Sequence, residues 1–286
     1  MSLPAVGPLP GERRGYGDVS GHQFHYREMG EGPAVVLLHQ APWASIQYRR
    51  ILPLVAAAGY RALAPDLPGH GLSDPLDPPT IERFAATVPA LLDALDIERA
   101  TLVGQHGGAL VAARAAAEMK LRASALVMDN CPLHAAGRRR ARLASIDESH
   151  FAKPDGEHWS DRWNLVRRIG DPGWSDETVH VAVLTYFANG PTREHLHRAA
   201  ATYDITPDLA RIECPVQVMA GRTDTLFDCA APIMALRPDW HYHEYAGGSA
   251  ELFERPEAWT SAVLGFVGKA LGGRIKKGLI CLRDKT

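Results

Sequence analysis

Short apolar runs alternate with amphipathic stretches through most of the chain. The runs at 34–39, 61–66, 101–104 and 124–129 are rich in Val, Leu and Ala and have no alternating polar positions. Runs of this length and kind predict parallel strands that are covered on both faces. The stretches 46–58, 80–95 and 107–120 have helical spacing, and Thr80 is a suitable N-cap. The alternation predicts an α/β fold with a mostly parallel twisted sheet flanked by helices.

Two regions depart from this rhythm. Residues 17–30 have alternating polar positions around Ser20 and Gly21, which predicts an edge hairpin. From 132 to 205 no buried strand pattern occurs, and the stretch is typical of amphipathic helices. The sheet pattern resumes at 214–221 and 240–246 and is followed by a helix to about 271. We therefore predict a core from 1–131 and 206–271, a helical cap insertion at 132–205 and a flexible basic tail at 272–286.

The composition is that of a globular protein with little net charge. Hydrophobic residues make up 46% of the 286 residues, which is enough to bury a sizeable core. The 31 basic and 33 acidic residues give a formal charge of −2. The protein therefore has no net positive charge that would attract nucleic acid or an anionic membrane surface. We expect a small-molecule substrate as the partner, no nucleic acid, no membrane, and a monomer or homodimer.

The N-terminal stretch and the cysteines indicate the compartment. The first residues are broken by Pro and Gly and contain no apolar run of signal-peptide or membrane-span length. The cysteines have no C-x-x-C spacing, which favours reduced thiols over a zinc site or a disulfide framework. They are Cys131, Cys214, Cys229 and Cys281. These features predict a cytoplasmic protein.

The run LVGQHGGALVAARA has the glycine spacing of a nucleophile elbow. Gly104 and Gly108 flank His106 as the glycines of G-x-S-x-G flank its serine. Such a turn holds its central residue in a strained backbone conformation, and strand and helix pass so closely that the neighbours must be small. His106 is therefore a candidate reacting group.

Five segments together resemble the α/β-hydrolase superfamily in order and spacing, over nearly the whole chain. They are HQAPWAS, DLPGHGLSD, LVGQHGGA, GRTD and GGSAELFERPEAW. The resemblance implies the α/β-hydrolase fold and places Asp224 at the position of the catalytic acid. It places His106 at the nucleophile position and Ser249 at the position of the catalytic histidine. The serine and histidine of the family have exchanged places.

This exchange leaves several functions open. Ser249 could attack with His106 as its base, in which case we expect Asp224 to lie beside the serine loop instead of behind the imidazole. Alternatively, His106 acts as a general base on water or a substrate hydroxyl, or it only lines a ligand-binding pocket. The leading hypothesis is a cofactor-independent hydrolase of a small, largely apolar ester or related carbonyl substrate. The alternatives are a lyase, isomerase or cofactor-free oxygenase that uses His106 as base, and a non-catalytic ligand-binding protein.

Backbone N–H groups at two further positions match the family's oxyanion hole. They belong to Gly107, which follows the elbow residue, and to Ala41 in the first βα loop. Gln40 stands where the family has a glycine, and its side chain would narrow the hole or donate to a substrate. Asp129 is an alternative position for the acid.

The remaining histidines and glycines give no sign of a metal or cofactor. His241 and His243 share one strand face without an acidic or cysteine ligand beside them, so we expect no metal. The sequence contains neither a phosphate-binding glycine loop nor a dinucleotide fingerprint, so we expect no cofactor. We expect His39 and His70 to be structural and the tryptophans at 159, 163 and 174 to be mainly packing residues.

Overall fold

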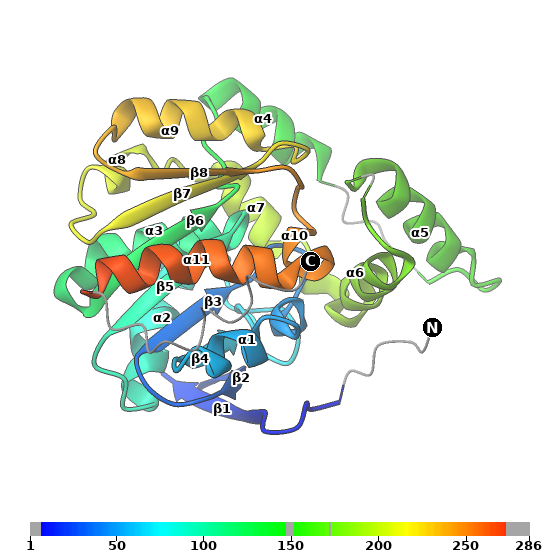
Figure 1. Cartoon of the computed structure of the whole chain (residues 1–286). Helices are drawn as coiled ribbons and strands as arrows, with labels where there is room; N and C mark the ends of the chain where they lie inside the picture. Colours follow the sequence, from blue (N-terminus) through cyan, green and yellow to red (C-terminus); the bar gives the residue numbers. More distant parts are fainter. Residues whose placement is uncertain (1–6, 147–151, 172, 273–286) are drawn as a thin grey trace, which may run out of the picture.

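A computed structural model describes residues 7–146, 152–171 and 173–272. Within these residues eight strands form one sheet in the order β1-β2-β4-β3-β5-β6-β7-β8 (Figure 1). β2 pairs antiparallel with β1 and β4, and the other neighbouring strands are parallel. The strands are β1 Arg13–Val19, β2 His22–Met29, β3 Ala34–Leu38, β4 Arg61–Pro65, β5 Ala100–Gln105, β6 Ala123–Asp129, β7 Val216–Gly221 and β8 His241–Tyr245. The predicted fold class is confirmed.

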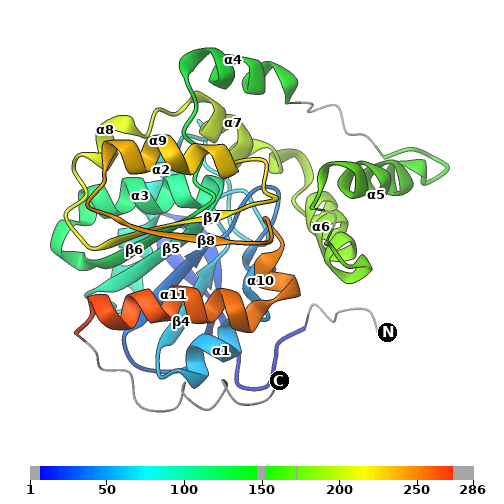
Figure 2. The same ribbon diagram turned by 45° about the horizontal axis from the view of Figure 1, so that its top comes forward.

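Helices flank the sheet on both faces (Figures 1 and 2). Side chains of α2 and α3 belong to one hydrophobic cluster, and those of α1 and α11 belong to a second cluster on the opposite face. The helices are α1 Leu52–Ala57, α2 Ile81–Ala94, α3 Gly107–Met119, α4 Ala136–Ser145, α5 Glu157–Ile169, α6 Asp176–Ala188, α7 His195–Thr202, α8 Thr206–Leu209, α9 Ala230–Leu236, α10 Glu251–Glu254 and α11 Pro256–Ala270. Their packing leaves β3, β5 and β7 fully buried.

The helix predicted at 46–58 is broken into two pieces. A short 3₁₀ turn spans Ser45–Tyr48, and α1 begins only at Leu52. Pro53 causes the break, because it lacks the N–H of the helical ladder and its ring clashes with the carbonyl four residues earlier. Pro53 is tolerated where it lies, in the first turn of α1.

The helical insertion lies between β6 and β7 and contains α4, α5, α6 and α7. Its last part is joined to core loops by hydrogen bonds. The Asn189 amide donates to the carbonyl of Pro42 at 2.6 Å and accepts from the N–H of Gly71 at 2.7 Å. Thr192 donates to the carbonyl of Gly69. These contacts hold the start of α7 over the ends of β3 and β4.

Some expectations lie outside the described residues. Of the predicted tail at 272–286, the structure describes only Gly272. Among the described helices, none is both long and apolar enough to cross a bilayer.

Candidate active site

His106 occupies the turn between β5 and α3 in a left-handed backbone conformation. Its φ is 50° and its ψ is −119°, a conformation that costs a non-glycine residue about 1–3 kcal/mol and often marks a functional site. The flanking glycines are required by close backbone contacts. A Cβ on Gly104 would lie 2.2 Å from the carbonyl oxygen of Gly108, and a Cβ on Gly108 would lie 2.2 Å from that of Leu38. The predicted elbow geometry is therefore present.

Asp224 lies directly behind the His106 imidazole. Nε2 of His106 donates to Oδ2 of Asp224 over 2.9 Å, and Oδ1 of Asp224 accepts from the N–H of Leu226 at 2.8 Å. Asp224 therefore contacts the imidazole, and its backbone also lies next to the serine loop, since a Cβ on Gly248 would be 3.1 Å from the Asp224 nitrogen. The imidazole of His106 points toward the loop after β7. Asp224, at the position of the family's catalytic acid, therefore contacts the residue at the elbow.

Ser249 lines the same cavity as His106 and Asp224. Its carbonyl accepts from the side-chain amide of Gln105 at 3.0 Å. No hydrogen bond links the Ser249 hydroxyl to His106 in the described part of the chain. The structure thus brings the three predicted residues to one cavity but joins only the histidine and the aspartate.

Of the two proposed oxyanion donors, only Ala41 is among the described residues that line the cavity. Gly107 is the first residue of α3, Ala41 lines the cavity, and neither backbone N–H has an acceptor among the described residues. The backbone N–H of Gln40 is already used, since it donates to Oε1 of Gln47 at 3.1 Å. The Gln40 side chain faces the cavity, and its Nε2 is buried without a hydrogen-bond partner.

Asp129 is a buried support below the elbow and makes no contact with the imidazole. Its carboxylate accepts from the hydroxyl of Tyr245 at 2.7 Å and the indole of Trp259 at 2.9 Å. It also accepts from Gln105 at 3.1 Å, and its carbonyl accepts from the N–H of His106 at 3.0 Å. Burial raises the pKa of Asp129 to about 6. Of the two acids, Asp224 contacts the imidazole, and Asp129 binds buried side chains next to the elbow.

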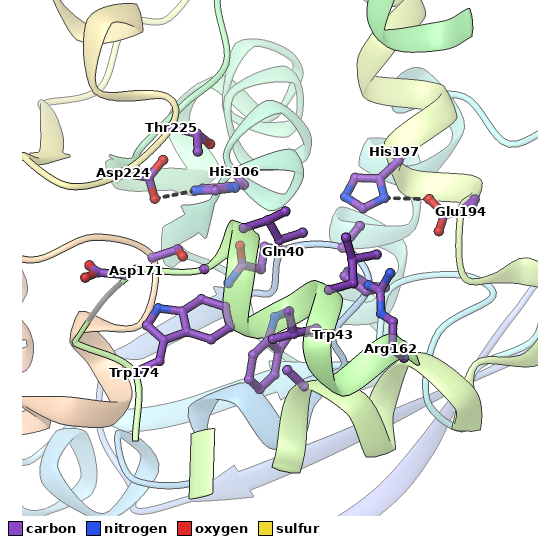
Figure 3. A pocket seen from close by; sticks show the side chains of 18 of the residues that line it. Gln40, Trp43, His106, Arg162, Asp171, Trp174, Glu194, His197, Asp224 and Thr225 are labelled. Carbon is purple, nitrogen blue, oxygen red and sulfur yellow. Dashed lines mark hydrogen bonds and ion pairs between the residues drawn. The ribbon is translucent and has the colours of Figure 1, made fainter. Parts of the chain in front are cut away.

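The cavity has a volume of about 490 Å³, within the usual range for small-molecule sites. One part of its lining is apolar and includes Trp43, Leu165, Val166 and Trp174. Polar side chains of the insertion line it as well, namely Arg142, Arg162, Glu194 and His197, of which Figure 3 labels Arg162, Glu194 and His197. The lining therefore combines apolar and polar side chains.

The other predicted loop histidines are fixed by backbone contacts. Nδ1 of His39 donates to the carbonyl of Gln40 at 2.8 Å, and its Nε2 accepts from the N–H of Leu67 at 2.9 Å. His70 donates to the carbonyl of Pro68 at 3.1 Å. Burial lowers the pKa of both imidazoles, and that of His70 falls to about 3. Both side chains are absent from the cavity lining.

The tryptophans of the insertion differ from one another. Trp163 and Trp174 are both partly buried against the second hydrophobic cluster, and Trp159 is 45% exposed. The packing prediction therefore describes Trp163 and Trp174, and Trp174 also lines the cavity. Sequence reasoning also missed Glu194, the N-cap of α7, and His197 within it, although their i, i+3 spacing is a signal that one helix face presents both. Among the described residues, no cluster of three His, Cys, Asp or Glu side chains could hold a metal ion.

The strand-turn-helix elbow, the carboxylate on the loop after β7 and the helical insertion after β6 define the α/β-hydrolase class of proteins. Residues 33–233 match the family described as alpha/beta hydrolase fold. That match covers more than half of the chain, and the chain belongs to this family. Membership establishes the fold, while the activity depends on the individual site.

Individual relatives include several hydrolases. An epoxide hydrolase from Caballeronia sordidicola is 33% identical over 181 residues, covering 61% of this chain and 52% of that protein. A haloalkane dehalogenase from Mycobacterium marinum is 42% identical over 101 residues, 34% of each chain. A hydrolase structure from Pseudomonas aeruginosa has a TM-score of 0.73 and 25% identity, and the match covers 89% of this chain and 98% of that one. The chain thus matches about half of the epoxide hydrolase's length and a third of the dehalogenase's.

Proposed function

We propose that the protein is a cofactor-independent hydrolase in which His106, oriented by Asp224, activates water against the carbonyl carbon of an ester or related substrate. The hydrogen bond of 2.9 Å between these two side chains carries the proposal. A carboxylate only accepts hydrogen bonds, so in the neutral imidazole the proton resides on Nε2 and the lone pair on Nδ1. Nδ1 has no hydrogen-bond partner among the described residues, and His106 lines the cavity.

Proton transfer from water to Nδ1 would raise the nucleophilicity of the water oxygen at the moment of attack. The two N–H groups of Ala41 and Gly107 would stabilise the negative charge that develops on the carbonyl oxygen. The unpartnered amide of Gln40 offers a third donor on the same side of the cavity. These groups supply a base, its orienting acid and an oxyanion site, which are sufficient for hydrolysis without a covalent intermediate.

The lining supports a substrate with an apolar acyl group. Trp43 and Trp174 offer flat apolar surfaces, and together with Val166 they provide contacts for an alkyl or aryl chain. The volume of about 490 Å³ suits a single small molecule. We therefore assign small esters with apolar acyl groups as the substrate class.

The test is hydrolysis of 4-nitrophenyl and ethyl butyrate in water enriched in ¹⁸O. We expect turnover by the purified chain, one ¹⁸O atom in the butyrate, and loss of turnover in His106→Ala. Turnover of these esters by His106→Ala at the wild-type rate would overturn the proposal, and so would complete inactivity of the wild type. A lyase or isomerase reaction would release products without oxygen from water, so the isotope separates these alternatives from hydrolysis.

A further inference from the structure

A second histidine-carboxylate pair faces the cavity from the helical insertion. Nδ1 of His197 and Oε2 of Glu194 lie 2.7 Å apart, and both residues line the cavity that contains His106. Glu194 is 8% exposed, whereas a third of the His197 side chain is accessible. The Nε2 atom of His197 has no hydrogen-bond partner in the described part of the chain. This nitrogen is therefore free to contact a molecule in the cavity.

The pairs His106–Asp224 and His197–Glu194 lie on two sides of the same cavity. Figure 3 shows the imidazoles of His106 and His197 on facing sides of the cavity, each with its carboxylate on the side away from the other imidazole. A small molecule that fills this volume contacts both sides. Each imidazole is oriented by its acid, and each leaves one ring nitrogen toward the ligand.

Packing fixes the distance between the two histidines. Leu196, the residue before His197, is fully buried and packs on the elbow. A Cβ on Gly107 would lie 2.9 Å from Cγ of Leu196, so α7 rests directly on the residue that follows His106. Because buried side chains at such contacts have little freedom to move, His197 is held at the site by the fold itself.

Ester hydrolysis needs a proton donor as well as a base. When the tetrahedral intermediate collapses, the bond between the carbonyl carbon and the alcohol oxygen breaks, and the electron pair leaves on that oxygen. An aliphatic alkoxide is a poor leaving group unless it receives a proton during bond cleavage. His106 removes a proton from water on one side of the substrate, so a donor on the other side completes the reaction.

We propose that His197, oriented by Glu194, is the general acid that protonates the leaving oxygen in the hydrolysis proposed above. Because Nδ1 of His197 donates to Glu194, Nε2 carries a proton only in the imidazolium form, which the Glu194 carboxylate stabilises. This proton on Nε2 moves to the leaving oxygen and leaves a neutral imidazole, while the proton from water moves to Nδ1 of His106. Exchange with solvent then removes the proton from His106 and restores the proton on His197. Ester and water become carboxylic acid and alcohol, and no further reactant is needed.

The test compares two esters that share one acyl group, 4-nitrophenyl butyrate and ethyl butyrate. Nitrophenolate leaves without a proton, whereas ethoxide needs one. We expect His197→Gln to lower kcat for ethyl butyrate by about 100-fold or more and to retain kcat for the nitrophenyl ester within about threefold. Glu194→Gln should show the same selectivity to a smaller extent. His241→Gln changes an exposed histidine on β8 and should leave both rates unchanged.

Equal losses on both esters in folded His197→Gln would show a structural role and overturn the assignment, and so would the absence of any loss. Thermal unfolding shows whether His197→Gln is folded. If it is not, Glu194→Gln takes its place: a selective loss on ethyl butyrate supports the assignment, and an equal loss or no loss on the two esters overturns it. Failure of the proposed hydrolysis itself has a different signature. In that case the wild type hydrolyses neither ester, or His106→Ala hydrolyses both at the wild-type rate.

Discussion

Nε2 of His106 lies 2.9 Å from Oδ2 of Asp224, although 118 positions separate the two residues in the chain. In the Ser-His-Asp triad the acid binds Nδ1 of the histidine and Nε2 transfers the proton. Here Asp224 accepts from Nε2 of His106. Nδ1, the ring nitrogen nearer the backbone, is therefore left for proton transfer. A histidine at the elbow position thus contacts the acid on the loop after β7 directly.

Replacing Asp224 by Asn should remove this orientation. The amide can donate a hydrogen bond to Nε2, which would place the imidazole proton on Nδ1 and block it as a base. We expect kcat for 4-nitrophenyl butyrate to fall by about 100-fold or more, measured by initial rates. The matched variant Asp228→Asn, on an exposed residue of the same loop, should keep the wild-type rate. Wild-type activity in Asp224→Asn would show that the contact has no catalytic role.

The Gln40 amide should affect activity and stability in opposite directions. Gln40→Leu removes a buried donor that has no partner, so we expect the free energy of unfolding to stay constant or rise. The same change should lower kcat/KM by about 10- to 100-fold if the amide donates to the developing oxyanion. Unchanged kcat/KM would exclude that contact.

Gln47→Leu is the comparison for Gln40→Leu. Gln47 accepts from the N–H of Gln40 at 3.1 Å and donates to the side chain of Gln105 at 2.8 Å. Its replacement leaves buried polar groups without partners, so the free energy of unfolding should fall by about 1–3 kcal/mol. Urea unfolding measures both variants.

Gly108→Ala should strongly destabilise the protein. The new Cβ would lie 2.2 Å from the carbonyl oxygen of Leu38 and 2.5 Å from that of His39, and neither backbone group can move without disturbing the sheet. We expect a loss of about 2–4 kcal/mol in the free energy of unfolding. Gly265→Ala on α11 meets no atom within 4 Å and should stabilise by up to about 1 kcal/mol. Equal effects of the two substitutions in urea unfolding would contradict the packing of the elbow.

His70 should make the protein sensitive to acid. Burial lowers the pKa of His70 from 6.5 to about 3, so the unfolded chain binds a proton at a pH where the folded chain does not. The stability from His70 is fully present above about pH 6.5. As the pH falls from there toward about 3, this residue should cost on the order of 1.4 kcal/mol per pH unit.

His70→Asn tests this dependence, since the Asn amide can replace the Nδ1 donor to the Pro68 carbonyl and does not titrate. The free energy of unfolding of the wild type should fall more steeply than that of the variant between pH 6.5 and 4.5. Parallel pH curves for the two proteins would show that His70 is not held neutral in the folded state.

The fold was largely predictable because it depends on local pattern. The uninterrupted apolar runs of β3, β5 and β6 and the glycines around His106 are visible in the sequence. Apolar spacing alone predicts one helix over 46–58, and the break comes from the N–H that Pro53 lacks. The proline is a local signal that the sequence contains.

The contacts of the site were less predictable. Alignment of motifs places Asp224 and Ser249 near the elbow, but the direction of the His106 ring depends on its rotamer, which spacing does not determine. The pair Glu194 and His197 lies at the cavity where Leu196 packs on Gly107. Such long-range packing of an insertion has no signature in a single sequence.

The central claim is that His106 activates water and that Ser249 does not attack the substrate. The most direct measurement is kcat for one substrate, 4-nitrophenyl butyrate, in His106→Ala and Ser249→Ala under identical conditions. The account predicts a loss of about 100- to 10,000-fold in His106→Ala and a rate within about threefold of wild type in Ser249→Ala. Comparable losses in both variants, together with a butyryl group found on Ser249 by peptide mapping of the quenched wild type, would contradict it and establish Ser249 as the nucleophile.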